Sequence, residues 1–115
     1  MKELDREILL SFWKAHILHH AGENPLHGQW VISELRRHGY EISAGTLYPL
    51  LHRMERLGWL KRKVDPDGGK RARKDYRLTT QGRKALQIVR EHIQELYGEV
   101  VLQSNGRHRR KRGRL

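Results

Sequence analysis

Residues 42–58 have the sequence ISAGTLYPLLHRMERLG, and this stretch decides the fold. Ser43 is a favourable N-cap residue and Gly58 is a natural stop, so we predict a helix from Ser43 to about Leu57. Its apolar residues recur every three or four positions and face a core: Leu47, Leu50, Leu51, Met54 and Leu57. The opposite face carries Gly45, Tyr48, Pro49, His52, Arg53 and Arg56. Such a two-faced helix is typical of the recognition helix in helix-turn-helix proteins.

Two more helices are predicted before this stretch. Residues 4–21 carry apolar residues over a wide helical surface, and residues 22–25 (GENP) end that helix. A second helix begins at His27 or Gly28 and runs to His38, where Gly39 stops it. We expect its apolar face to be buried, with Trp30, Val31 and Leu35 in the core. Trp59 is also expected there.

A hairpin and a last helix are predicted after it. Residues 59–64 and 74–78 resemble two antiparallel strands joined by a turn that contains DPDGG. Thr79 or Thr80 then caps a helix that reaches about Leu102. The order predicts a mainly α protein with a small β-hairpin: a winged helix-turn-helix followed by a C-terminal dimerisation helix. The expected divisions are a DNA-binding domain (1–78), the dimerisation helix (79–103) and a basic disordered tail (104–115).

Length and composition restrict the class of protein. A chain of 115 residues has room for one domain, and the absence of cysteine excludes disulfides and thiolate metal sites. The N-terminal residues are charged and precede only a short apolar run, so we expect neither a signal peptide nor a membrane span. We therefore expect a cytoplasmic, nucleoid-associated protein.

The net charge of +11 is concentrated in two segments. Six cations and no acid follow Ser104, and residues 61–77 hold eight cations against three aspartates. The rest of the chain sums to zero. Charge held in two patches favours a polyanionic partner over simple solubility.

Three segments resemble the PadR family of transcriptional regulators. The SAGTLYP and LHRME runs, at 43–49 and 51–55, are similar to its recognition helix. Leu26-His27-Gly28 is similar to the start of its second helix, and residues 71–83 to its wing strand and last helix. The resemblance covers about residues 4–90. Trp30 and the tail after Ser104 depart from it, and the single terminal helix is typical of the short branch of the family.

The resemblance implies a homodimer that binds promoter DNA, usually as a repressor released by a small molecule. The expected contacts with DNA are of two kinds. Thr46 and Tyr48 would contact bases in the major groove, while Ser43, Arg53 and Arg56 would contact the backbone. The hairpin cations would reach the backbone or the minor groove nearby: Lys70, Arg71, Arg73 and Lys74.

The last helix carries a heptad pattern of apolar residues: Leu86, Val89, Ile93, Leu96 and Val100. Their spacing of three and four is typical of a helix–helix seam, so we expect this seam to join two copies of the chain. A single intramolecular core face is the alternative.

Two effector sites are considered. His16, His19 and His20 are spaced so that their imidazoles could converge on a divalent metal such as zinc. Trp13 could line a chamber for a small aromatic ligand, although packing in the core is the commoner role of such a residue. Surface histidines without a metal are the alternative for the first.

The sequence contains no nucleophile–base pair, carboxylate pair or phosphate loop, so no enzymatic activity is expected. Three other functions stay open: a non-specific architectural binder of nucleic acid, a metal-responsive regulator, and a protein-interaction module.

The basic tail yields a first prediction. Deleting residues 105–115 removes six cations, so the plot of log affinity for DNA against log salt should become shallower, by up to ~5. Preference for the operator over random DNA should persist, because electrostatic contacts with phosphates carry no sequence information. Titrations at several salt concentrations measure both, and an unchanged slope would exclude the tail from the DNA contact.

Overall fold

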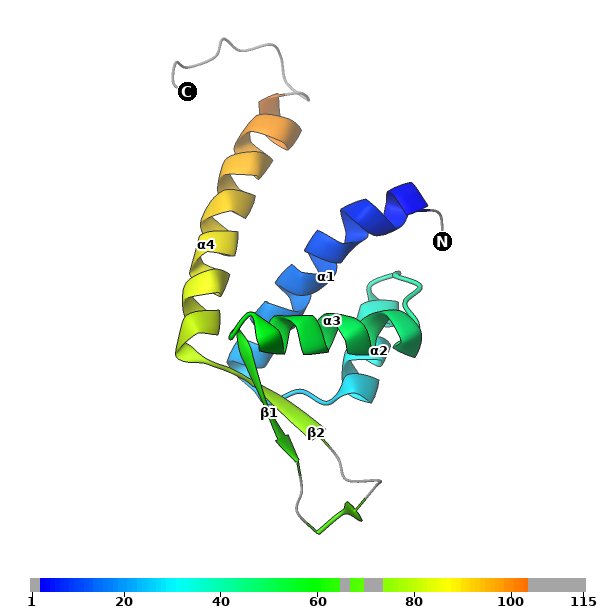
Figure 1. The fold of residues 1–115 in the computed structure, drawn as a ribbon. Coiled ribbons are helices and arrows are strands. Elements are labelled where there is room, and N and C mark those ends of the chain that lie inside the picture. The colour runs from blue at the N-terminus through cyan, green and yellow to red at the C-terminus, as the bar shows by residue number, and fades with distance from the viewer. Residues whose placement is uncertain (1–2, 65–66, 70–73, 104–115) are drawn as a thin grey trace.

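The chain forms a three-helix body with a hairpin and a long C-terminal helix (Figure 1). The structure is a computed structural model and describes residues 3–64, 67–69 and 74–103. The order of its elements is α1 (Glu3–Glu23), α2 (Gly28–Arg37), α3 (Ala44–Arg56), β1 (Leu60–Val64), β2 (Lys74–Leu78), α4 (Thr80–Leu96) and a π-helix, η2 (Tyr97–Gln103). The predicted class, a mainly α winged helix-turn-helix, is confirmed. The predicted tail lies outside the described residues.

Two glycines end the helices of the helix-turn-helix unit. Gly39 and Gly58 have φ angles of 95° and 84°, a backbone region that residues with a Cβ rarely adopt. After α2, the N–H groups of Gly39 and Tyr40 bond to the carbonyls of Arg36 and Leu35. After α3, the N–H groups of Gly58 and Trp59 form the equivalent pair of bonds. These paired bonds satisfy the last carbonyls of each helix and turn the chain sharply.

The core lies where α1, α2 and α3 meet the hairpin. Its largest fully buried side chains include Trp13, Ile17, Leu35, Leu51 and Tyr76. The apolar face predicted for α3 is confirmed at Leu47, Leu50, Leu51 and Met54. The hairpin joins this body through Leu26, whose N–H and carbonyl both pair with the backbone of Tyr76 (2.9 and 2.7 Å).

Three expectations about the core and the strand are corrected. Trp30 is 40% exposed, because α2 turns Val31, Ile32 and Leu35 inward and leaves position 30 at the edge of that face. Leu57 is 41% exposed, because α3 ends at Arg56 and the turn at Gly58 carries it away from the core. Trp59 is only half-buried and precedes the strand, which begins at Leu60.

The start of α4 is fixed against the end of α3. The Thr79 hydroxyl accepts a hydrogen bond from the N–H of Gly82 (2.8 Å) and donates one to the carbonyl of Gly58 (2.6 Å). The predicted cap at Thr79 is confirmed. From there α4 passes alongside α1 and extends beyond the three-helix body (Figure 1). In the part of the chain that the structure describes, no helix is both long and apolar enough to cross a membrane.

Gly82 provides a test of this junction. A Cβ on Gly82 would lie 2.2 Å from the carbonyl oxygen of Trp59, a backbone atom that cannot easily move. Gly82→Ala should therefore lower the free energy of unfolding by ~1–3 kcal/mol, measured by urea denaturation at fixed protein concentration.

The matched control is Gly45→Ala, also in the first turn of a helix. Its Cβ would lie 3.8 Å from the nearest atom, the Ser43 hydroxyl oxygen. This substitution should leave stability unchanged or raise it by about 0.5–1 kcal/mol through helix propensity. Equal effects of the two substitutions would contradict close packing at Gly82.

Candidate nucleic-acid interface

The outer face of α3 carries the residues predicted to contact DNA. Ser43, Arg53 and Arg56 are exposed, and Thr46 and Tyr48 are half-buried. Ser43 occupies the N-cap position with extended backbone angles, but its side chain makes no capping hydrogen bond. Because the first amides of a helix have no intrahelical acceptor, the hydroxyl and these amides together suit a phosphate.

Tyr48 has a packing role that the sequence did not reveal. A Cβ placed on Gly28 would lie 2.2 Å from the Tyr48 hydroxyl, so the tyrosine ring lies directly against the first turn of α2. Gly28 is itself buried. The two motifs that carry the family resemblance, LHG at 26–28 and GTLYP at 45–49, therefore touch through this pair. The side chain is half-buried, so part of it still lies at the surface of α3.

The hairpin adds cations beside this face. Lys74 is exposed on β2, whereas Lys70, Arg71 and Arg73 lie outside the described residues. The two strands expose further cations that the site prediction omitted: Lys61, Arg62, Lys63 and Arg77. Arg62 pairs with Glu55 of α3 at 3.7 Å, which ties the hairpin to the recognition helix. Sequence reasoning could have found Lys61, Lys63 and Arg77 from their charge, because they belong to the basic segment 61–77.

The heptad pattern of α4 divides into two parts. Leu86 is buried and Val89 partly buried against the protein's own core, so the start of the seam is intramolecular. Ile93 and Leu96 continue the same stripe beyond the body, whereas Val100 lies in η2, after α4 has ended; all three are more than half exposed. On α1, Ile8 and Phe12 are exposed to a similar degree.

The histidines group differently from the prediction. Donor atoms of His16, His20 and His38 lie within 4.8 Å of one another, joining α1 to the end of α2. His19 belongs instead to a second, more exposed group with His20 and Glu23. Helical spacing brings His16 and His20 together, as expected, but His38 is distant in sequence and no local pattern indicated it.

Glu34 lies among these imidazoles. Its Oε2 atom is 3.5 Å from His20 Nε2 and 3.1 Å from His38 Nε2. Hydrogen bonds from Arg37 are the main cause that lowers the pKa of Glu34 to about 2, against the opposing effect of burial. Burial, followed by the neighbouring charges of His38 and His20, lowers the pKa of His16. At neutral pH the site therefore holds an ionised carboxylate beside a neutral His16 imidazole.

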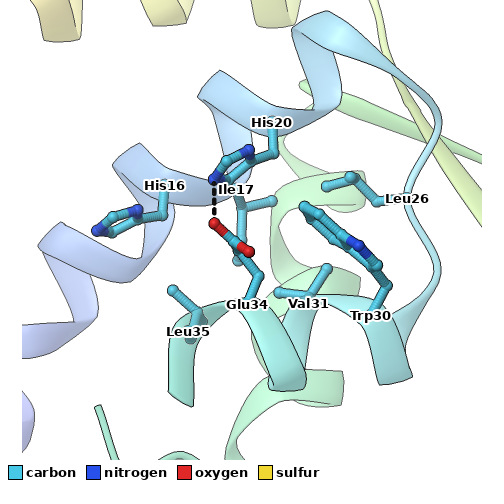
Figure 2. Close-up of a pocket in the computed structure, with 8 residues that line it drawn as sticks. All are labelled: His16, Ile17, His20, Leu26, Trp30, Val31, Glu34 and Leu35. Atoms are coloured by element: carbon cyan, nitrogen blue, oxygen red, sulfur yellow. Dashed lines mark ion pairs between the residues drawn. The ribbon is translucent and has the colours of Figure 1, made fainter. Parts of the chain in front are cut away.

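Figure 2 shows the hollow that these side chains border. His20 projects from α1 toward Glu34, which rises from α2, whereas the ring of His16 points away from Glu34, and Trp30 stands on the other side of His20. The hollow is a shallow depression with no room for an organic ligand, whose pockets begin at about 300 Å³.

Trp13 does not line this hollow or any other surface. Its side chain is 0% exposed and meets Tyr40 edge to face, with ring centroids 6.0 Å apart. Of the two roles considered for Trp13, the structure shows packing in the core and not the lining of a ligand chamber.

Known proteins support the same fold. The family model described as the transcriptional regulator PadR-like family matches residues 17–88. The transcriptional regulator Rv3488 of Mycobacterium tuberculosis is 48% identical over 99 residues, which cover 84% of this chain and 89% of that protein.

Two solved structures are similar to the chain. A PadR family transcriptional regulator from Eggerthella lenta is 31% identical, with a TM-score of 0.68 and coverage of 85% of this chain and 89% of that one. A PadR-like transcription factor from Bacteroides fragilis is 23% identical, with a TM-score of 0.74 and coverage of 86% and 96%. The second likeness concerns the fold alone.

Proposed function

Because the chain belongs to the PadR-like family of transcriptional regulators, we propose that it binds operator DNA in a sequence-specific manner as a homodimer and represses transcription. The observation that carries this proposal is the outer face of α3, polar and basic along its length and flanked by the exposed cations of the hairpin. We also propose that an effector binds the protein and releases it from the DNA.

The proposed DNA contact places α3 in the major groove. A helix enters that groove with its N-terminal residues nearest the base edges, which gives Thr46 and the free edge of Tyr48 the reading role. Arg53 and Arg56 lie in the last turn of α3, where the phosphate backbone passes. The exposed hairpin cations Lys61, Lys63 and Lys74 extend the positive surface to the neighbouring strand of the duplex.

The proposed dimer uses the part of α4 and η2 that extends beyond the body. Ile93, Leu96 and Tyr97 are each more than half exposed, and exposed apolar clusters of this size mark interfaces. A second copy is the occupant that fits best, because the stripe continues the seam that packs on the protein's own core. Two copies joined there present two recognition helices to two half-sites.

Base reading is tested on α3. Thr46→Ala should reduce the preference for the operator over random duplex by ~1–3 kcal/mol, since a base contact is lost. Arg56→Ala should weaken binding to both duplexes by the same factor, since phosphate contacts carry no sequence information. Fluorescence anisotropy with DNA from upstream of the protein's own gene measures both.

Lys84→Ala is the control, because Lys84 is an exposed cation on α4 that belongs neither to the outer face of α3 nor to the apolar seam of α4. It should change neither affinity by more than the general charge effect. A Thr46→Ala protein with full operator preference would exclude base reading by the start of α3, and a wild-type protein that binds operator and random duplex equally would favour an architectural binder.

Assembly is tested on α4. Replacing Ile93 and Leu96 with aspartate should produce monomers, because burying unpaired carboxylates in an apolar seam is unfavourable. Those monomers should bind the operator poorly, since one subunit contacts only one half-site. Analytical ultracentrifugation measures the mass.

Ile88→Asp is the control for this test. Ile88 is 54% exposed but lies on another side of α4, two positions past Leu86, so its substitution should leave the dimer intact. A wild-type chain that sediments as a monomer at micromolar concentration would refute the dimer.

A further inference from the structure

We propose that His16, His20, His38 and Glu34 form a binding site for one divalent transition-metal ion of the zinc type, which links α1 to the C-terminal end of α2. The site shares His16 and His20 with the sequence hypothesis, but it excludes His19 and adds His38 and Glu34.

The spacing of the donor atoms fits an ion. Glu34 Oε2 already lies 3.1 Å from His38 Nε2 and 3.5 Å from His20 Nε2. Donor atoms of the three histidines lie within 4.8 Å of one another. In a tetrahedral zinc site the donors are each about 2.1 Å from the ion and hence about 3.4 Å apart. To complete that geometry, His16 would have to turn its ring toward Glu34.

The donor set selects the class of metal. Three imidazole nitrogens and one carboxylate oxygen suit zinc and its neighbours, whereas magnesium and calcium require mostly oxygen ligands. The chain contains no cysteine, so no thiolate within it competes for the ion.

Other side chains hold the ligands in position. Arg37 donates two hydrogen bonds to Glu34, from Nε to Oε1 (3.1 Å) and from an Nη atom to Oε2 (2.8 Å). Trp30 meets the His20 ring nearly at right angles, and Tyr40 does the same to His16. Such supporting contacts fix ring orientation and usually accompany metal sites.

The surroundings favour a small charged ligand over an organic one. Ile17, Val31 and Leu35 form the floor of the hollow, as Figure 2 shows, and the side chain of Glu34 is only 12% exposed. Partial exclusion of water strengthens the attraction between the carboxylate and a cation. The hollow has no space for a bound water, so an ion would lie among the donor atoms themselves.

The test is isothermal titration of zinc into the untagged, metal-free protein, with cobalt(II) as a spectroscopic probe. We expect one ion per chain and the strong visible absorption of four-coordinate cobalt(II). His16→Gln and His38→Gln should each weaken zinc binding by more than ~100-fold, and Arg37→Gln, which removes only a supporting contact, by ~10–100-fold.

His19→Gln is the matched control. His19 is on the same helix and 47% exposed in its side chain, outside the proposed ligand set, so its substitution should leave zinc affinity unchanged. His38 is exposed at the helix end, so His38→Gln should fold normally, as circular dichroism would verify. Wild-type affinity in His38→Gln, or loss of affinity in His19→Gln, would overturn the proposed ligand set.

A second measurement links the site to regulation, and this link rests on the proposed function. Zinc should change operator affinity in the wild type and in His19→Gln but not in His38→Gln. If zinc binds and operator affinity stays constant, the metal site stands and the regulatory link fails. If no protein prefers the operator, the proposed function fails while the titration still tests the site.

Discussion

The hydrogen bonds of Thr79 join the DNA-reading part of the molecule to its long C-terminal helix. Its hydroxyl bonds to Gly58 at the end of α3 and to Gly82 at the start of α4, and its N–H bonds to the carbonyl of Trp59 (3.1 Å). Gly82 lies so close to Trp59 that no side chain fits between them. The direction of α4 relative to α3 is therefore fixed by a few atoms. In a dimer built on α4, that direction sets the distance between the two recognition helices, which half-sites one helical turn apart require to be about 34 Å.

The same close approach of backbone and side chain recurs inside the helix-turn-helix unit. Tyr48 of α3 lies against Gly28 of α2, and Gly39 closes α2 with paired hydrogen bonds before the chain turns. A larger residue at position 28 would push α3 away from α2. The resemblance at LHG and GTLYP thus has a physical explanation, since the two motifs form the contact that sets the angle between these helices.

Much of this architecture was predictable because its causes are local. Apolar spacing of three and four indicated the core face of α3, and Gly39, Gly58 and Thr79 indicated its boundaries and those of its neighbours. The errors arose where the local sequence pattern does not determine burial or contacts between distant residues. Leu57 continues the apolar spacing of α3, but the helix ends before it, and Trp30 is hydrophobic yet lies at the edge of its face. His38 joins His16 only through the packing of α2 on α1, which no spacing within one helix predicts. The sequence showed an apolar seam along the last helix. Only the structure shows which half of that seam is buried in the protein's own core and which half is exposed.

The histidine cluster joins two helices of the helix-turn-helix unit, so a ligand bound there would act on their relative position. α1 packs against α2, α4 and β2, so it touches the helix-turn-helix unit, the hairpin and the long C-terminal helix. An ion shared by His16, His20 and His38 would hold α1 and α2 together at the C-terminal end of α2. At the other end of α2, its first turn packs against Tyr48 of α3. A ligand alters an equilibrium only when it binds one arrangement more tightly than another. Donor atoms on two separate helices meet that condition, because any movement of α2 relative to α1 changes the distance between His38 and the α1 imidazoles. Trp13, fully enclosed in the core, offers a ligand no comparable difference between two arrangements.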